Sequence, residues 1–290
     1  MPLRKKIFLS LLMALLLLGL MLWPRQQRES CKVPVLLYHH FAAEATADTV
    51  VSSTRFREQM TALKEAGFTA VTLQQLVDYV ERGRSLPEKP VLITMDDGYT
   101  SNLTIAAPIL DELGLHAAVF VIGVNEGREV YLHSGEPLYP TRFSYEEAAP
   151  WVEKGTLDLQ CHSWDMHQLA SYGFSGREGM LPLPEETAQA YQRALQTDLE
   201  TFRQRRGSRV STALCAIAYP YGYYTEALDQ YLGELGVPVT FTTVEQCSRL
   251  RRGDPASLRM LGRFNVTEAW DGKALVKRLE RASIDIPFFF

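Results

Sequence analysis

The sequence has few cysteines, no internal repeat and, beyond its first thirty residues, no low-complexity tract. Its four cysteines allow three pairings; Cys161 and Cys215 lie in apolar runs, so we expect them to be buried thiols. Charge is also nearly balanced, because 30 basic and 34 acidic residues give a net charge of -4. This balance excludes a general nucleic-acid-binding protein, and the 46% hydrophobic and 22% charged content excludes a disordered or fibrous chain.

The first thirty residues carry a segment suited to lipid. A basic cluster at residues 4–6 precedes an apolar run over residues 7–23, at the lower length limit for a spanning helix, and no small-residue cleavage site follows. We expect residues 1–30 to form an uncleaved signal anchor that exports residues 31–290, since basic residues stay in the cytoplasm. A cleaved leader is the alternative and gives the same compartment. Cys31 lacks the preceding small residues that lipoprotein processing needs.

After the leader, short β-branched and aromatic runs alternate with amphipathic stretches, the pattern of parallel strands joined by crossover helices. Their continuous apolar character suits burial on both faces. The strand candidates are residues 33–40, 68–72, 90–95, 117–123, 157–162, 215–220, 238–243 and 260–266. Eight strands and about as many helices predict an α/β fold, a (β/α) barrel of about seven to eight strands, as one domain over residues 31–290.

Capping residues mark the starts of four helices. These starts are Ser53 or Thr54, Thr72, Ser144 and Pro184, and the last helix is expected to run to about Arg206. Two long segments, residues 124–143 and 168–183, are rich in glycine, proline and tyrosine and follow strands. In a barrel such loops form the rim of the active site.

Two adjacent carboxylates, Asp96 and Asp97, follow the apolar strand 90–95 and precede Gly98. Neighbouring side chains on a strand point to opposite faces, so the two carboxylates should have different roles unless the backbone turns. The alternative interpretation is an ordinary Asp-Gly turn without chemical function.

Two histidines, His162 and His167, also lie at the end of a strand. Together with an upstream carboxylate they make a plausible facial zinc site with open positions for water and substrate. Other divalent transition metals, such as cobalt or nickel, would bind similar ligands. The alternative is a pair of histidines whose nitrogens are satisfied by hydrogen bonds.

Two further strand ends carry candidate groups. Residues 219–222, Tyr-Pro-Tyr-Gly, predict a tight turn that leaves the amide of Tyr221 able to face a pocket; a turn that merely packs is the alternative. His39 or His40, at the end of the first strand, is placed to supply a proton, and an exposed histidine is the alternative there.

These motifs, in this order and at strand ends, resemble those of the polysaccharide deacetylases of carbohydrate esterase family 4, the NodB-like fold. The motifs are TMDDGY at 94–99, HSWDMH at 162–167 and YPYG at 219–222. The resemblance covers roughly residues 33 to 270. It implies a distorted (β/α) barrel, a divalent metal usually taken to be zinc, and removal of N- or O-acetyl groups from sugar polymers.

Within this family, the segment VPVLLYHHF and the four-residue gap between His162 and His167 are similar to the permuted branch that deacetylates poly-β-1,6-N-acetylglucosamine in biofilm matrices. The commoner family pattern has three residues between the metal histidines. The resemblance implies these roles: Asp96 as general base, Asp97, His162 and His167 as metal ligands, the Tyr221 backbone N–H in the oxyanion hole and His39 as general acid.

One residue departs from the family pattern. Ala218 stands where the third motif usually has an arginine, so the base lacks its usual partner. Arg263 is placed to reach across the barrel and replace it, as the permuted branch implies; an ordinary surface arginine is the alternative. We also expect Trp164 and Tyr99 to contact substrate.

The sequence therefore predicts a zinc-dependent (or other divalent-metal-dependent) hydrolase that removes N-acetyl groups, by cleaving non-peptide amide bonds, from an extracytoplasmic polysaccharide. The chain would be exported, either secreted or held at the membrane by its N-terminal helix. Two alternatives stay open: a peptidoglycan or xylan deacetylase, and a catalytically silent glycan-binding protein that grips sugar through aromatic side chains. Those aromatic residues are Tyr131, Tyr139, Trp164 and Tyr172. The sequence leaves the oligomeric state open.

Overall fold

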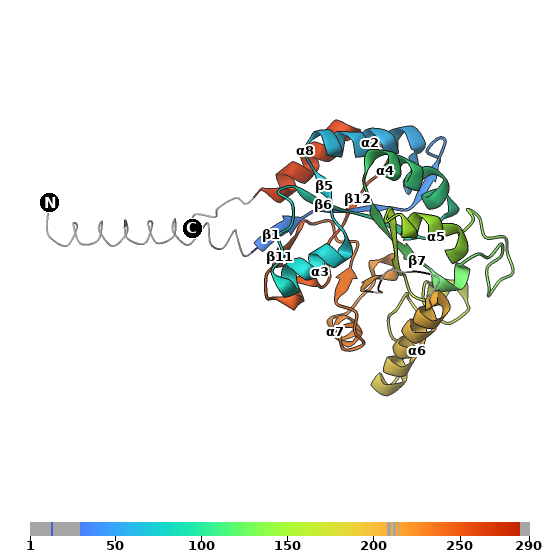
Figure 1. Ribbon diagram of the computed structural model, residues 1–290. Coiled ribbons are helices and arrows are strands. Elements are labelled where there is room, and N and C mark those ends of the chain that lie inside the picture. The colour runs from blue at the N-terminus through green and yellow to red at the C-terminus, as the bar shows by residue number, and fades with distance from the viewer. Residues whose placement is uncertain (1–12, 14–29, 208–209, 211–212, 214, 285–290) are drawn as a thin grey trace, which may run out of the picture.

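The computed structural model of the chain describes residue 13 and residues 30–284, with gaps at 208–209, 211–212 and 214 (Figure 1). The predicted signal anchor, residues 1–30, lies outside the described residues except for Met13 and Ser30. Within the described ranges, every helix is too short or too polar to cross a bilayer.

A parallel sheet forms the centre of the protein, in the strand order β10-β9-β8-β7-β6-β2-β12, with β5 attached to β6. All eight predicted strands are present, so the α/β prediction is confirmed. Their bounds are β2 (Val35–Tyr38), β5 (Thr69–Ala70), β6 (Pro90–Asp97), β7 (Ala117–Val121), β8 (Leu157–Cys161), β9 (Ala216–Ala218), β10 (Val239–Phe241) and β12 (Phe264–Asn265).

The sheet curls so far that one segment near the C-terminal end of the chain pairs with β10 on one side and with β2 on the other. Leu261 forms an isolated parallel bridge with Phe241 of β10, and Phe264 pairs with Leu36 of β2. Because β12 is only two residues long, it does not complete a regular eight-stranded barrel. The observed architecture is a curled half-barrel of seven parallel strands in one path, which agrees with the distortion predicted from the sequence.

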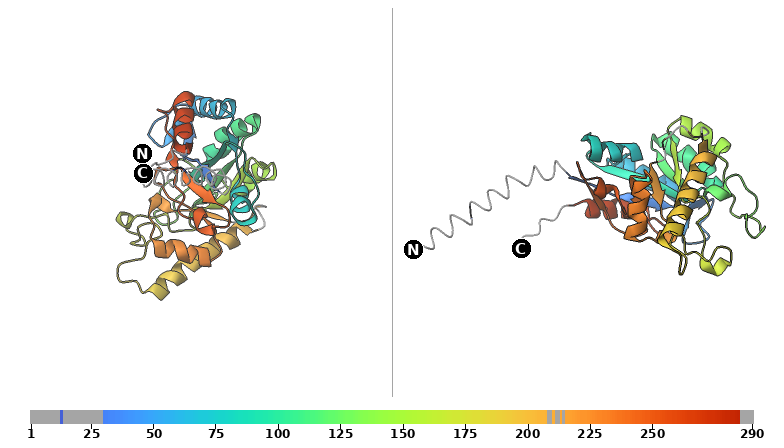
Figure 2. Two further views of the ribbon diagram at one scale, coloured as in Figure 1. Left: turned by 90° about the vertical axis from the view of Figure 1, so that its left-hand side faces the viewer. Right: turned by 90° about the horizontal axis from the view of Figure 1, so that it is seen from below.

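Helices cover the outer side of the sheet (Figures 1 and 2). They are α2 (Ser53–Glu65), α3 (Leu73–Arg82), α4 (Ala107–Leu113), α5 (Tyr145–Glu153), α6 (Ala188–Arg206), α7 (Glu226–Glu234) and α8 (Gly272–Ser283). Shorter helical turns are η1 (Asn102–Ala106), η2 (Gly123–Asn125), η3 (Ala170–Tyr172), η5 (Pro220–Gly222) and η6 (Pro255–Leu258).

Two predicted helix starts are confirmed and two are wrong. Thr72 and Ser144 cap α3 and α5, each with a complete capping box. The cap of α2 is Ser52, whose hydroxyl accepts the N–H of Arg55, rather than either of the next two residues. The helix predicted to open at Pro184 begins later, after its cap Thr187.

Four short strands lie outside the predicted set. They are β1 (Ser30–Val33), β3 (His40–Ala42), β4 (Val50–Ser52) and β11 (Ser248–Arg251). β1 pairs antiparallel with β11, and β3 pairs parallel with β4. Each has only three or four residues and pairs with one other strand, so none carries a long apolar run.

Alternate residues of the strands fill the inside of the half-barrel. Val35, Leu92, Phe120 and Phe241 are fully buried there as one apolar cluster. Alternation along β6 places Asp96 on this same inner side, where it pairs in register with Phe120. The polar site therefore sits directly above an apolar interior. The cysteines of the described residues form no disulfide; Cys161 is buried as predicted, whereas Cys215, also expected to be buried, is partly exposed just before the short strand β9.

Candidate active site

The two aspartates at the end of β6 reach the same site because the backbone turns between them. Asp96 continues the strand with its side chain inward, whereas Asp97 has φ +74° and Gly98 has φ +71°. Both carboxylates are buried, at 2% and 9% exposed. The left-handed conformation of Asp97 brings its carboxylate to 3.6 Å from Nε2 of His162, which the Asp96 carboxylate also approaches, at 3.8 Å, so the Asp-Gly turn serves the site rather than replacing it.

Asp97, His162 and His167 converge on one point. The Oδ1 atom of Asp97 lies 3.6 Å from Nε2 of His162 and 3.5 Å from Nε2 of His167. These distances exceed those of ordinary hydrogen bonds, yet donor atoms about 2.0–2.2 Å from a tetrahedral zinc ion are about 3.3–3.6 Å apart. The three residues therefore fit a divalent cation by spacing and by donor type.

The protonation states also suit a cation. His162 donates its Nδ1–H to the carbonyl of Ala218 at 2.8 Å, which leaves Nε2 with a free lone pair. Burial lowers the pKa of His167 to about 4, so its imidazole is neutral at neutral pH. Burial alone would raise the pKa of Asp97, but the neighbouring histidines and Arg142 hold it well below its usual range. An ionised carboxylate thus faces the neutral imidazole of His167.

Arg263 pairs with Asp96 inside the half-barrel. Its two terminal nitrogens donate to the two carboxylate oxygens at 2.7 and 2.8 Å, and its Nε donates to the carbonyl of Thr242. The side chain is fully buried, with the guanidinium over the rings of Phe120 and Phe241. Burial raises the pKa of Asp96, but the charge and hydrogen bonds of Arg263, together with the neighbouring histidines His162 and His39, outweigh it, so the net pKa is lowered. Arg263 is thus no surface residue.

His39 lies within electrostatic range of the two carboxylates, since it contributes to lowering the pKa of both Asp96 and Asp97. The adjacent His40 contacts another group, with Nδ1 2.9 Å from the hydroxyl of Ser101. The role of His39 as general acid stays a prediction.

Tyr221 occupies the turn after β9 in a strained backbone conformation, with φ +58°. Its ring packs against the imidazole of His167 at 4.4 Å between centroids. The following Gly222 has φ +74°, and a Cβ there would lie 2.0 Å from the hydroxyl of Thr243. Only glycine at this position lets the turn bring Tyr221 beside the candidate metal ligands.

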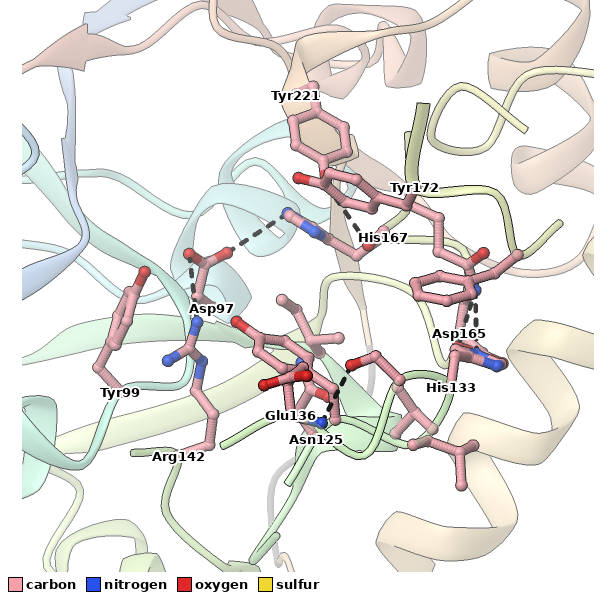
Figure 3. Close-up of a pocket in the computed structure, with 17 residues that line it drawn as sticks. Asp97, Tyr99, Asn125, His133, Glu136, Arg142, Asp165, His167, Tyr172 and Tyr221 are labelled. Carbon is pink, nitrogen blue, oxygen red and sulfur yellow. Dashed lines mark hydrogen bonds and ion pairs between the residues drawn. The ribbon is translucent and has the colours of Figure 1, made fainter. Parts of the chain in front are cut away.

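A cavity of about 500 Å³ opens above these residues (Figure 3). Its lining combines the site with both predicted loops and includes Asp97, Tyr99, Tyr131, His167, Tyr172 and Tyr221. The expectation that Tyr99 contacts substrate stays a prediction, and its position allows it. Trp164 lies outside this cavity: its ring packs against the backbone of Gly123 and lines an adjoining hollow that shares His133 and Asp165 with the cavity. Its substrate contact also stays a prediction.

The structure adds residues that the sequence analysis missed. Arg142 is 9% exposed, stacks 3.6 Å over the ring of Tyr99 and lies 4.0 Å from the Asp97 carboxylate. His133 contacts both carboxylate oxygens of Asp165 at 2.8 and 2.9 Å. The loop composition marked residues 124–143 as an active-site segment, but which side chains turn inward depends on the loop path, which has no local signal.

Two histidines and two carboxylates at the carboxyl ends of a parallel α/β sheet define a protein with a candidate metal site at the strand ends. The family model described as "Polysaccharide deacetylase" matches residues 83–240, more than half of the chain. The chain belongs to the polysaccharide deacetylase family and is a carbohydrate amide hydrolase by class. The family resemblance and the enzyme class predicted from the sequence are both confirmed.

Two curated relatives illustrate the range of similarity. YxkH of Bacillus subtilis (strain 168), which is also named as a polysaccharide deacetylase, is 24% identical over 258 residues, 89% of this chain and 79% of its own length. The poly-beta-1,6-N-acetyl-D-glucosamine N-deacetylase of Escherichia coli (strain K12) is 25% identical over 247 residues, 76% of this chain. The match spans only 36% of that second protein.

Solved structures share the fold. IcaB from Ammonifex degensii matches with a TM-score of 0.67 and 25% identity, over 88% of this chain and 98% of IcaB. A de-N-acetylase from Aggregatibacter actinomycetemcomitans matches with a TM-score of 0.72 and 20% identity, over 86% of this chain and 99% of that one. The NodB-like half-barrel of this chain is therefore the fold of these deacetylases.

Proposed function

We propose that this chain is a divalent-metal-dependent N-deacetylase of an extracytoplasmic polysaccharide of the poly-N-acetylglucosamine type. The observation that carries the proposal is the convergence of Asp97, His162 and His167 beside the Asp96–Arg263 pair at the base of one cavity. A ligand set, an ionised base and a pocket for substrate are what hydrolysis of an acetamide requires.

Asp97, His162 and His167 would hold the metal, with zinc as the expected ion. When bound, such an ion polarises the acetyl carbonyl and lowers the pKa of water from 15.7 to about 7. Asp96 is the proposed general base: each oxygen accepts one N–H of Arg263 and keeps a second lone pair for the proton of the attacking water. Arg263 keeps Asp96 ionised, since the arginine lowers its pKa.

The remaining steps fall to Tyr221 and His39. The backbone N–H of Tyr221 is the proposed donor to the oxygen that becomes negative as water adds to the acetyl carbon. His39 is the proposed general acid, which protonates the sugar nitrogen as the carbon–nitrogen bond breaks. The products are acetate and a free amine on the glycan.

The proposed substrate rests on two supports. The Escherichia coli relative is named for poly-beta-1,6-N-acetyl-D-glucosamine, although it shares 25% identity with this chain. The cavity walls carry the aromatic rings of Tyr131 and Tyr172, which are suited to the apolar faces of sugar rings.

We further propose that residues 31–290 act outside the cytoplasm, tethered by residues 1–30. Carbonate extraction of membranes and the N-terminal sequence of the exported protein test that placement.

Acetate release from defined oligosaccharides tests the function. We expect release from β-1,6-linked N-acetylglucosamine oligomers to exceed release from β-1,4-linked oligomers, to stop with a chelator and to return on adding Zn²⁺. Preference for the β-1,4 oligomers or for acetylated xylan would instead support a peptidoglycan or xylan deacetylase. Binding of glycan and metal with no release from any glycan would overturn the enzymatic proposal and support a glycan-binding protein.

A further inference from the structure

One buried carboxylate near the site has no part in the proposed chemistry. Asp198 lies on α6, which is otherwise a mostly polar helix on the outside of the sheet, and only 7% of the residue is exposed. Its Oδ1 accepts the backbone N–H of Trp164 and its Oδ2 accepts that of Asp165, both at 2.8 Å. These two residues lie between the two histidines of the candidate metal site.

The segment between the histidines is held from two sides. On one side, the carbonyls of Ser163 and Trp164 accept the N–H groups of Gly123 and Val124, which follow β7. On the other side, the N–H groups of Trp164 and Asp165 donate to the carboxylate of Asp198 on α6. The segment also turns sharply, because Ser163 has φ +68° and its hydroxyl accepts the N–H of Met166.

This arrangement leaves little freedom to the backbone that joins the two imidazoles. The ring of Trp164 lies against Gly123 so closely that a Cβ there would be 2.4 Å from it. A carboxylate that accepts two successive N–H groups is a charge-assisted contact, roughly twice as strong as a neutral one. Losing it would free the segment on the helix side, while the carbonyls of Ser163 and Trp164 stay bonded to Gly123 and Val124.

We propose that Asp198 is a positioning residue for the metal site: by fixing the backbone of Trp164 and Asp165, it sets the separation of His162 and His167. This proposal rests on the proposed metal-dependent function. Burial raises the pKa of Asp198 to about 6, so the charged carboxylate is held there against a solvation penalty. An apolar residue would avoid that penalty but would leave both N–H groups without an acceptor.

The test is the affinity of the full-length protein for Zn²⁺, measured without substrate by competition with a chromophoric chelator. Asp198→Asn keeps the shape but turns an NH₂ group toward one of the two N–H donors. We expect its dissociation constant for Zn²⁺ to rise by about 10- to 100-fold, the usual effect of losing an outer-shell partner. Excess Zn²⁺ should restore most of the acetate release, because the reacting groups are intact.

A matched control separates positioning from a general loss of stability. Asp78 on α3 is also buried, at 5% exposed, and accepts hydrogen bonds from Gln74, Arg82 and Arg84, away from the cavity. We expect Asp78→Asn to lower the unfolding midpoint and to leave the Zn²⁺ affinity unchanged. Equal Zn²⁺ affinity in Asp198→Asn and the wild type, or an equal loss in both variants, would overturn the proposal.

A second variant covers the case in which Asp198→Asn does not fold. Asp198→Glu keeps the carboxylate one methylene further out, and we expect a smaller, severalfold loss of Zn²⁺ affinity; an unchanged affinity would overturn the proposal. Measurements on the wild type separate a failure of the proposed function from a failure of the proposed role of Asp198. A wild type that binds no Zn²⁺ overturns the proposed function along with this role, whereas tight binding and acetate release by the wild type leave Asp198 alone in question.

Discussion

Arg263 and Asp96 are 167 residues apart in the sequence and form a two-pronged ion pair in the interior of the half-barrel. The guanidinium lies over two phenylalanine rings, and its third nitrogen donates to the carbonyl of Thr242, so its position is fixed. The pair joins the last strands of the sheet to the end of β6. It supplies the charge that keeps a buried carboxylate ionised next to Asp97.

Replacing this arginine should slow the enzyme without releasing its metal. In Arg263→Met the pKa of Asp96 rises, so we expect the acid limb of the pH–rate profile to move to higher pH. Turnover at neutral pH should fall by about 10²-fold, the lower range for loss of acid–base catalysis. Turnover and metal content by mass spectrometry measure the two effects. Arg259→Met, which breaks a buried pair with Asp229 outside the cavity, is the control. Metal loss in Arg263→Met would show that the assignment is wrong.

The three proposed ligands should be distinguishable from another histidine of the same cavity. Alanine at Asp97, His162 or His167 removes one donor atom, so we expect the Zn²⁺ affinity to fall by more than about 10²-fold, beyond the range for outer-shell changes. His133→Ala removes a cavity histidine that pairs with Asp165, and its Zn²⁺ affinity should stay within about tenfold of the wild type. Titration with Zn²⁺ checks both, and the reverse order of effects would refute the ligand assignment.

The turn that presents Tyr221 should be sensitive to one methyl group. Gly222→Ala places a Cβ against Thr243, so the turn must shift. We expect turnover to fall by about 10²–10³-fold, as for loss of an oxyanion donor. Gly114→Ala shares the positive φ, at +67°, but meets no atom within 4 Å, and should keep full turnover. Tyr221→Phe should also keep full turnover, because the proposed donor is the backbone N–H of this residue. A large loss in Tyr221→Phe would assign the role to the phenol instead.

The proposed general acid should matter only for a poor leaving group. In His39→Gln the sugar amine leaves without its proton donor, so we expect acetate release from the glycan to fall by about 10²–10⁴-fold. An activated aryl acetate, whose leaving group needs no proton, should lose far less. His40→Gln, whose imidazole contacts Ser101, is the neighbouring control and should act on both substrates as the wild type does. Equal losses on both substrates in His39→Gln would argue against an acid.

Asp198 should make the free energy of unfolding depend on pH. Its pKa is about 6 in the folded chain, above the ordinary 3.8, because burial disfavours the charge. Between those values the folded chain keeps a proton that the unfolded chain has lost, so this group's contribution to stability falls as the pH rises from 4 to 7. Relative to Asp198→Asn, the wild type should lose about 2 kcal/mol over that range. Denaturant unfolding with a chelator measures the difference, and a constant difference would contradict the shifted pKa.

The local features of this protein were predictable from its sequence. Continuous apolar runs predicted the eight strands of the sheet, because a strand buried on both faces carries its own signal. The caps Thr72 and Ser144 were readable for the same reason, since a capping box involves residues only three apart. The aspartates of β6 and the histidines after β8 could be placed at strand ends, which all meet at one edge of a parallel sheet.

Other features depended on how distant segments meet. No local pattern pairs Arg263 with Asp96, because that contact exists only once the sheet has curled far enough to bring its last segment over β6. The same holds for Asp198, whose helix must pack beside the histidine segment before its carboxylate has N–H groups to accept. The position of Trp164 against Gly123 likewise depends on how the two segments pack.

The amino-acid sequence by itself determined the strand and helix pattern, the order of the motifs and the chemical types available at the strand ends, since each of these depends on neighbouring residues. The tertiary structure decided which of those groups face one another, which histidine stands beside the carboxylates and which buried charge supports them. Partners far apart in the chain are chosen by the curl of the sheet and the paths of its loops, which arise only when the whole core packs.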